Sequence, residues 1–188
     1  MKMRNQIRSI SALLIALVAI IILTVPHRAM AVDTAAIERD SKAAVAKLYE
    51  TTPAAKKLGE KAKAVLVFPS ILKAGLIIGG QGGNGALFVD GKTVAYYNIS
   101  AASYGLQAGV QEFGYAMFLM TDSAREYIDK SDGWEVGVGP TIVVVDEGAA
   151  KSLTTTTAKD DVYAFIFSQK GIMAGIGIQG SKITKLNP

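Results

Sequence analysis

Glycine alternates with bulky apolar residues in the last third of this chain, most clearly over residues 134–139 (WEVGVG) and 175–178 (GIGI). Successive side chains of a strand point to opposite faces, so this pattern gives a strand one bulky face and one nearly bare face. Glycine weakens a strand unless a backbone crossing, a bend or a ligand needs the space that it leaves. The pattern therefore predicts a curved, glycine-rich, antiparallel sheet.

Shorter patterns predict the other strands and their turns. Asp90-Gly91 stands between two apolar runs, which is a strong signal for a tight hairpin. Pro69 is expected to end a short buried strand, and the glycine-rich run over residues 79–85 is expected to form a turn. The predicted strands cover residues 65–68, 75–78, 86–89, 93–97 and 115–120.

Three helices are expected. Residues 34–50 lack glycine and proline and place Ile37, Ala44, Val45 and Leu48 at helical spacing. Thr52 followed by proline predicts a second helix from residue 53 to about residue 64, and Thr121 is expected to cap a short helix over residues 122–130. The expected fold is α+β, with N-terminal helices packed on a twisted antiparallel sheet that forms a sandwich or a partly closed barrel.

The first 31 residues differ from the rest in composition. Lys2, Arg4 and Arg8 precede a mostly apolar, uncharged run over residues 10–25, and the motif Ala29-Met30-Ala31 follows. These features are typical of a secretion signal, so we expect export with cleavage after Ala31. An uncleaved anchor helix is the alternative, because the apolar run is slightly long for the core of a signal peptide, although it is slightly short of the roughly 20 residues that span a bilayer. We expect a signal peptide over residues 1–31 and one domain over residues 32–188, located in the periplasm or outside the cell.

Charge and composition after residue 31 exclude several classes of function. Four of the 20 basic side chains and none of the 16 acidic ones lie in the first 31 residues, so the rest of the chain has no net charge and shows no sign of nucleic-acid binding. The only histidine, His27, also lies there, and the chain has no cysteine. Histidine or cysteine catalysis, zinc sites built on these residues, disulfides and a lipoprotein anchor are therefore not expected. We expect no cofactor and no metal.

A set of motifs in fixed order gives the chain a resemblance to a known family. It resembles the SYLF domain family, in its bacterial exported form, over about residues 34–188. The motifs that carry the resemblance are AVLVFPS (64–70), KAG (73–75) with Gly79-Gly80, SAASYGLQAG (100–109), DGW (132–134), QKGIM (169–173) and ITK (183–185).

The resemblance implies a lipid-binding module. Members in yeast and animal adaptor proteins bind phosphoinositides, and some bind actin, which an exported chain is not expected to meet. Lipid contact in the family is associated with the basic helical segment before the first strand, which corresponds here to residues 53–64. The lipid-binding residues implied by this match are Lys56, Lys57, Lys61 and Lys63.

The distribution of charge supports a lipid-binding end independently. Residues 42–73 contain seven lysines and two glutamates, although the domain as a whole is neutral. Lys57 and Lys61 would repel each other as a like-charge pair on one helix, and anionic head groups would reduce this repulsion. The alternative is an ordinary solvated helix face. Leu58 and the neighbouring alanines would either pack inward or insert shallowly into the membrane.

Two motifs suggest enzymes. Ser70-Ile71-Leu72-Lys73 fits the S-x-x-K motif of serine–lysine hydrolases, but the later partners, Ser131-Asp132-Gly133 and Lys170-Gly171, are imperfect. The pairs Asp146-Glu147 and Asp160-Asp161 could bind a cation or act as acid and base, although solvated loop charge is the favoured interpretation.

Two further groups of residues have both a functional and a structural interpretation. The glycine run over residues 79–85 could hold a phosphate group, but it lacks the ending of a P-loop and a turn is favoured. Six aromatic residues could line an acyl-chain groove, although core packing is favoured: Tyr96, Tyr97, Tyr104, Phe113, Tyr115 and Trp134.

These observations favour non-enzymatic binding of anionic phospholipid at an envelope membrane. The competing interpretation is a structural envelope protein that binds another protein and whose lysines are inert. A serine–lysine hydrolase is the third alternative.

Overall fold

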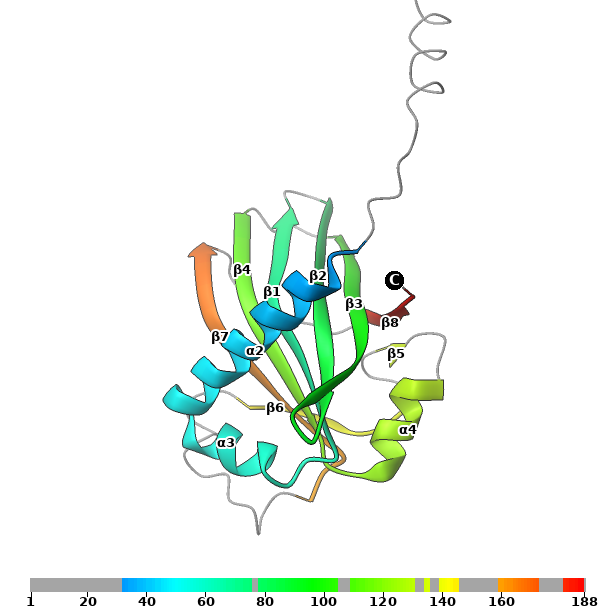
Figure 1. Ribbon diagram of the computed structural model, residues 1–188. Coiled ribbons are helices and arrows are strands. Elements are labelled where there is room, and N and C mark those ends of the chain that lie inside the picture. Colours follow the sequence, from blue (N-terminus) through cyan, green and yellow to red (C-terminus); the bar gives the residue numbers. More distant parts are fainter. Residues whose placement is uncertain are drawn as a thin grey trace, which may run out of the picture. The chain divides into compact units, whose positions relative to one another are not determined.

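The computed structural model describes residues 32–75, 78–104, 109–130, 134–135, 139–145, 159–172 and 181–187. These residues form the helices α2, α3 and α4 and the strands β1 to β8 (Figure 1). Residues 33–188 make up one compact unit. No helix in the described part of the chain is both long enough and apolar enough to cross a bilayer.

Two of the three helices begin directly after the predicted residues Thr52 and Thr121, although the Thr52 side chain makes no capping hydrogen bond, and the first helix begins after Asp33. Helix α2 spans Thr34–Thr51, and the carboxylate of Asp33 accepts a 2.9 Å hydrogen bond from the backbone N–H of Ala36. Helix α3 spans Pro53–Gly59, and helix α4 spans Asp122–Lys130. The Thr121 hydroxyl accepts a 3.2 Å hydrogen bond from the Ala124 N–H, which confirms its capping role.

The strands form one eight-stranded sheet in the order β5-β8-β3-β2-β1-β4-β7-β6. The α+β class is confirmed, but the sheet is mixed, because β6 runs parallel to β7, whereas the other pairs are antiparallel. The two outermost strands do not pair with each other in the described part of the chain, so the sheet is open rather than a sandwich or a barrel. The bounds are β1 Ala64–Gly75, β2 Ile78–Val89, β3 Lys92–Tyr104, β4 Gly109–Leu119, β5 Trp134–Glu135, β6 Ile142–Val145, β7 Val162–Ile172 and β8 Lys182–Leu186.

Pro69 lies inside β1, so the prediction that it ends this strand was wrong. The register of β1 against β4 shifts between Phe68 and Ile71, and the register against β2 shifts between Val67 and Leu72. Proline has no N–H to donate and is tolerated within a sheet at such irregularities. The bulge therefore lets the strand continue to Gly75.

The glycine run over residues 79–85 is part of β2, so the predicted turn was also wrong. A Cβ atom on Gly83 would lie 2.4 Å from the carbonyl oxygen of Ser70, and one on Gly85 would lie 2.4 Å from that of Val67. The two strands approach each other too closely for any side chain at these positions. These glycines therefore serve a close backbone crossing.

The hairpin between β2 and β3 confirms the Asp90-Gly91 prediction. Asp90 has φ of 49° and Gly91 has φ of 74°, which are left-handed values at both central positions of the turn. Such a turn matches the natural twist of the two strands that it joins.

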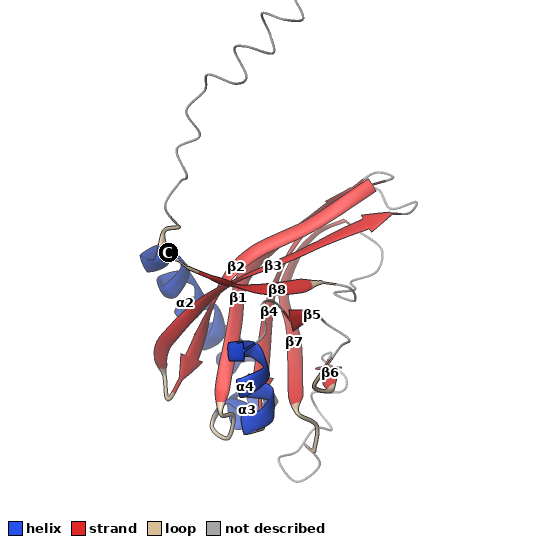
Figure 2. Cartoon of the chain, turned by 90° about the vertical axis from the view of Figure 1, so that its right-hand side faces the viewer, coloured by secondary structure: helices blue, strands red, loops and turns tan. Residues whose placement is uncertain are grey.

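Side chains on the two faces of the sheet form two separate cores. Helices α2 and α3 cover one face, where the Ser41 hydroxyl donates a 3.1 Å hydrogen bond to the Val67 carbonyl. Helix α4 contributes Ala124 and Ile128 to the core on the other face. In Figure 1 the upper parts of β4, β1 and β2 extend beyond α2, and Figure 2 shows that the long strands bend along their length.

The aromatic residues that the structure describes mostly fill these cores. Tyr97, Phe113 and Tyr115 are fully buried in the α4-side core, and Tyr96 packs partly buried against the α2-side core. Core packing is therefore confirmed for these four residues. The side chains of Tyr104 and Trp134 lie outside the described part.

Several other sequence predictions also fall outside the described residues. They are the signal peptide over residues 1–31, the alternation of glycine with apolar residues over residues 136–138 and 175–178, the Ser-Asp-Gly motif of the hydrolase alternative over residues 131–133, and the carboxylate pair at residues 146–147.

Candidate lipid-binding site

Helix α3 is shorter than the sequence predicts. It begins at Pro53, which occupies its first turn, and it ends at Gly59 instead of near Ala64. A Cβ atom on Gly59 would lie 2.2 Å from the hydroxyl oxygen of Tyr49, so the end of α3 packs directly against α2. The basic segment is therefore a two-turn helix followed by a connection to β1.

The backbone of this connection explains why the helix stops. The N–H groups of Lys61 and Ala62 both donate to the Leu58 carbonyl, at 3.0 and 2.8 Å, which tightens the last turn. The Lys63 N–H then donates to the Leu119 carbonyl of β4 at 2.8 Å, so the sheet ladder begins here. Lys57 and Lys61 are consequently not a pair on one helix, and the premise of like-charge repulsion along that helix was wrong.

All four predicted lysines are exposed. Lys56 and Lys57 lie in α3, whereas Lys61 and Lys63 lie in the connection to β1. Two of the positive charges therefore stand in the last turn of α3, where they also interact favourably with the helix dipole. The structure places the four side chains within one short segment at one end of the domain.

The one large apolar side chain of α3, Leu58, packs inward together with Ala55. Leu58 is 2% exposed and Ala55 is 0% exposed, and both belong to the core beneath α2. This answers the question that the sequence left open, because in this structure Leu58 has no free surface to insert into a membrane. Apart from Pro53, the exposed residues of α3 are the charged Lys56 and Lys57.

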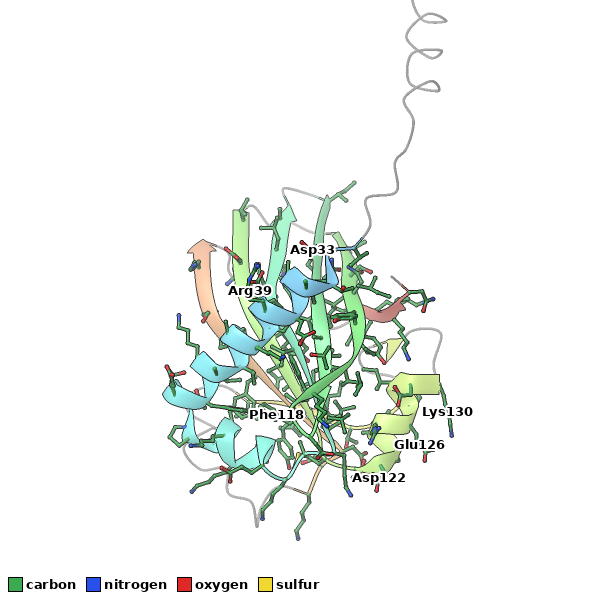
Figure 3. The ribbon with its side chains drawn as sticks, in the orientation of Figure 1. Asp33, Arg39, Phe118, Asp122, Glu126 and Lys130 are labelled. Atoms are coloured by element: carbon green, nitrogen blue, oxygen red, sulfur yellow. The ribbon has the colours of Figure 1, made fainter. Side chains whose placement is uncertain are left out.

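Two acidic residues reduce the positive charge of this segment. The Lys63 ammonium lies 3.4 Å from a carboxylate oxygen of Asp122, the first residue of α4 (Figure 3). Glu60 stands close to Tyr49, where burial first and the Glu60 charge second raise the pKa of the tyrosine hydroxyl. The Asp122 contact is one that sequence reasoning missed, because it joins residues 59 positions apart.

The serine–lysine hydrolase alternative loses its geometric basis. The Ser70 hydroxyl donates a 2.7 Å hydrogen bond to the Glu112 carboxylate, whereas Lys73 pairs in register with Gln111, the neighbour of Glu112 in β4. Adjacent residues of a strand point to opposite faces. Ser70 and Lys73 therefore lie on opposite faces of the sheet and do not form a nucleophile and base pair.

The carboxylate pair at residues 160–161 holds loops together. Asp160 accepts a 3.0 Å hydrogen bond from the Tyr163 hydroxyl, and Asp161 accepts from the hydroxyls of Thr121 and Thr141 at 3.0 and 3.2 Å. The sequence favoured solvated loop charges at this pair, but both carboxylates accept hydrogen bonds from neighbouring side chains. Across the described residues, no three acidic, histidine or cysteine side chains gather closely enough to hold a metal ion.

A comparison with protein families gives a match to the second part of the chain. Residues 100–187 match the family Ysc84, described as Las17-binding protein actin regulator. The matched residues contain the end of β3 and the strands β4 to β8. Helices α2 and α3, strands β1 and β2 and the four lysines precede them. A comparison with curated proteins finds no match.

The family match confirms the resemblance that the sequence motifs indicated. Four of the motifs quoted above lie wholly within the matched residues, at 100–109, 132–134, 169–173 and 183–185. Over residues 100–187 the chain is therefore similar to the Ysc84 family, which is the SYLF family that the motifs resemble.

Proposed function

We propose that this protein binds anionic phospholipid at the surface of an envelope membrane, without catalysis. The observation that carries the proposal is the segment of four exposed lysines whose one large apolar side chain, Leu58, is buried. Lys56, Lys57 and Lys61 would contact head groups directly, and Lys63 would contribute less because of its partner Asp122. The family resemblance adds the expectation of lipid binding, and we do not extend the actin regulation in the family description to a chain expected to be exported.

The binding would be peripheral and reversible. A lysine near an anionic leaflet contributes about 1 kcal/mol, so three lysines supply about 3 kcal/mol, or roughly a hundredfold preference for anionic over neutral membranes. Leu58 would add no apolar contribution to membrane binding, because it faces the core together with Ala55. Residues 1–31 would direct the chain out of the cytoplasm as a signal peptide, or would anchor it if they are retained.

One observation favours a second candidate, an envelope protein that binds another protein. Leu72, Ile78 and Val110 are 54%, 73% and 57% exposed, although they are large apolar side chains. They belong to the neighbouring strands β1, β2 and β4. A protein partner could cover them, whereas the lysines of α3 would then be inert.

Ionic strength separates the two candidates. Binding to anionic vesicles through lysines weakens steeply when salt rises from low to physiological concentration and above, because the interaction is screened. An apolar protein interface does not weaken in this way. Vesicle binding that persists unchanged in about 0.5 M salt, or that is equal for neutral and anionic vesicles, would contradict the proposal.

A further inference from the structure

Helix α2 covers only part of its face of the sheet. In β1 the side chains of residues 64–68 are all buried, whereas buried and exposed positions alternate over residues 71–74. Successive side chains of a strand point to opposite faces, so the first pattern indicates cover on both faces and the second indicates cover on one. The buried residues Ile71 and Phe113 belong to the core on the α4 side. The uncovered face is therefore the one on the α2 side, where the strands extend beyond α2 (Figure 1).

Large and small apolar residues share this uncovered face, which we call the distal face. Leu72, Ile78 and Val110 are 54%, 73% and 57% exposed. A row of register partners crosses the face through Val110, Ala74, Gly80 and Ala102, on the neighbouring strands β4, β1, β2 and β3. We define the distal face by six exposed residues: Leu72, Ala74, Ile78, Gly80, Ala102 and Val110.

The fold of one copy gives no steric reason for glycine at position 80. The nearest atom to a Cβ on Gly80 would be the Ala101 carbonyl oxygen at 3.5 Å, an ordinary contact. A Cβ on Gly83 or Gly85 would instead lie 2.4 Å from a carbonyl oxygen of β1. Glycine is unfavourable within a strand unless something needs the space that it leaves. At Gly80 that space opens outward, onto the distal face.

The charges of this region do not favour an anionic membrane. The six residues of the distal face are uncharged, and Glu112 and Lys170 at its border stand in register with opposite charges. The Glu112 carboxylate also accepts a 2.7 Å hydrogen bond from the Ser70 hydroxyl. Attraction to an anionic leaflet requires an excess of lysine and arginine, which this pair does not supply. An apolar protein surface suits the distal face better.

We propose that the distal face binds the same face of a second copy of this chain. Because α2 occupies the rest of the face, the second copy must lie with its own α2 at the opposite end, so the twofold axis runs across the strands. The rows of the two copies then face each other in reversed order, about 10 Å apart. Leu72 of each copy lies over the small residues Ala74 and Gly80 of the other, which is the reciprocity that a twofold interface requires.

The size of the distal face suits a weak and reversible dimer. From β7 at its border to β3 it extends over five strands about 4.8 Å apart, and over about six residues with a rise of about 3.3 Å each. Two such faces would bury on the order of 1,000 Å² in total, which is near the lower limit for a specific interface. We therefore expect dimers to form at micromolar or higher concentration.

This interface is separate from the lysines proposed to contact the membrane. Lys63 directly precedes β1 and Leu72 lies near its other end, about 30 Å away at about 3.3 Å per residue of extended chain. Dimer formation therefore requires no lipid binding. A variant with Lys56, Lys57, Lys61 and Lys63 changed to Gln should form dimers as the unaltered protein does, so failure of one proposal leaves the other standing.

Sedimentation velocity of the purified protein tests the interface, over about two decades of concentration around the micromolar range. We expect monomers and dimers and no larger species, because a twofold interface closes on itself. Val110→Glu places a carboxylate in each half of the interface and should lower the dimer affinity at least about tenfold. Val94→Glu is the matched control: Val94 is 53% exposed, next to the hairpin at the other end of β3, and its variant should form dimers normally.

Gly80→Leu separates a shaped interface from general apolar association. The substitution adds apolar surface, so non-specific association would strengthen, but it fills the space that Leu72 of the second copy needs. We expect a folded variant whose dimer is weaker. The proposal is overturned if the unaltered protein stays monomeric or forms larger species, if Val110→Glu forms dimers as Val94→Glu does, or if Gly80→Leu associates more strongly. A monomeric protein that loses vesicle binding only in Val110→Glu would show instead that the distal face contacts a membrane.

Discussion

The Lys63 ammonium lies 3.4 Å from the Asp122 carboxylate, and this contact joins the connection after α3 to the first residue of α4. Both side chains remain substantially exposed, at 49% and 71%. An ion pair of this kind adds little stability, but it neutralises one of the four positive charges at the candidate lipid-binding site. The four lysines are therefore not equivalent.

We expect this inequality to show in single substitutions. Lys57→Gln should weaken binding to anionic vesicles about fivefold, because one lysine contributes about 1 kcal/mol. Lys63→Gln should cost less, and Asp122→Asn should strengthen binding, since it frees Lys63. Sedimentation with vesicles at low salt measures all three variants. If Lys63→Gln weakens binding as much as Lys57→Gln does, the ion pair has no role in lipid binding.

Leu58→Ala should lower the free energy of unfolding without changing the lipid affinity of the folded protein. Leu58 is 2% exposed in the core beneath α2, and truncating such a side chain costs about 2–5 kcal/mol. Urea unfolding measures the loss, and Lys56→Ala on the exposed side of α3 is the matched control, expected within about 0.5 kcal/mol. A Leu58→Ala variant with unchanged stability and weakened vesicle binding would show instead that Leu58 inserts into the membrane.

Two glycines of β2 should respond very differently to alanine. A Cβ atom on Gly85 would lie 2.4 Å from the Val67 carbonyl oxygen, so Gly85→Ala must displace backbone and should cost about 1–3 kcal/mol or more. On Gly80 the nearest atom would be the Ala101 carbonyl oxygen at 3.5 Å, an ordinary contact. Gly80→Ala should therefore be neutral or slightly stabilising. Equal urea midpoints for the two variants would refute the close crossing of β1 and β2.

Tyr115 should make the protein less stable at alkaline pH. Burial raises the pKa of its hydroxyl, so the folded protein keeps a proton that the unfolded chain releases above about pH 10. This contribution is fully present at lower pH, and stability falls as the pH rises beyond that value. Thermal unfolding from about pH 8 to pH 11 should therefore show a smaller loss for Tyr115→Phe than for the unaltered protein.

The same variant tests the environment of the Tyr115 hydroxyl at neutral pH. The hydroxyl is buried and has no hydrogen-bond partner among the described residues. Tyr115→Phe should consequently be at least as stable as the unaltered protein at about pH 7. A loss of more than about 1 kcal/mol would indicate that the hydroxyl is hydrogen-bonded after all.

Local signals in the sequence predicted the elements that local interactions determine. The spacing of Ile37, Val45 and Leu48 gave α2, the Asp90-Gly91 turn gave the hairpin, and Thr121 gave the start of α4. In each of these the interactions that fix the backbone lie within a few residues. The α+β class followed from the same patterns.

The predictions that failed depended on contacts between distant segments. Pro69 and the glycine run over residues 79–85 look like breaks in the chain, but a bulge in β1 and a close crossing between β1 and β2 accommodate them. The end of α3 depends on Tyr49 and on the ladder with Leu119.

The central claim is that the lysines of α3 and of its connection to β1 bind anionic membranes. Its most direct test is vesicle sedimentation of the unaltered protein and two variants with the same change in charge. One variant changes Lys56, Lys57, Lys61 and Lys63 to Gln, and the control changes four other exposed lysines to Gln: Lys42, Lys130, Lys182 and Lys185.

We predict that the unaltered protein and the control variant bind anionic vesicles and not neutral ones at low salt, and that the first variant loses this binding. Equal binding by the two variants would contradict the claim, because general charge and not this segment would then be responsible. Absence of binding by the unaltered protein would also contradict it and would favour a protein partner at the exposed face that includes Leu72, Ile78 and Val110.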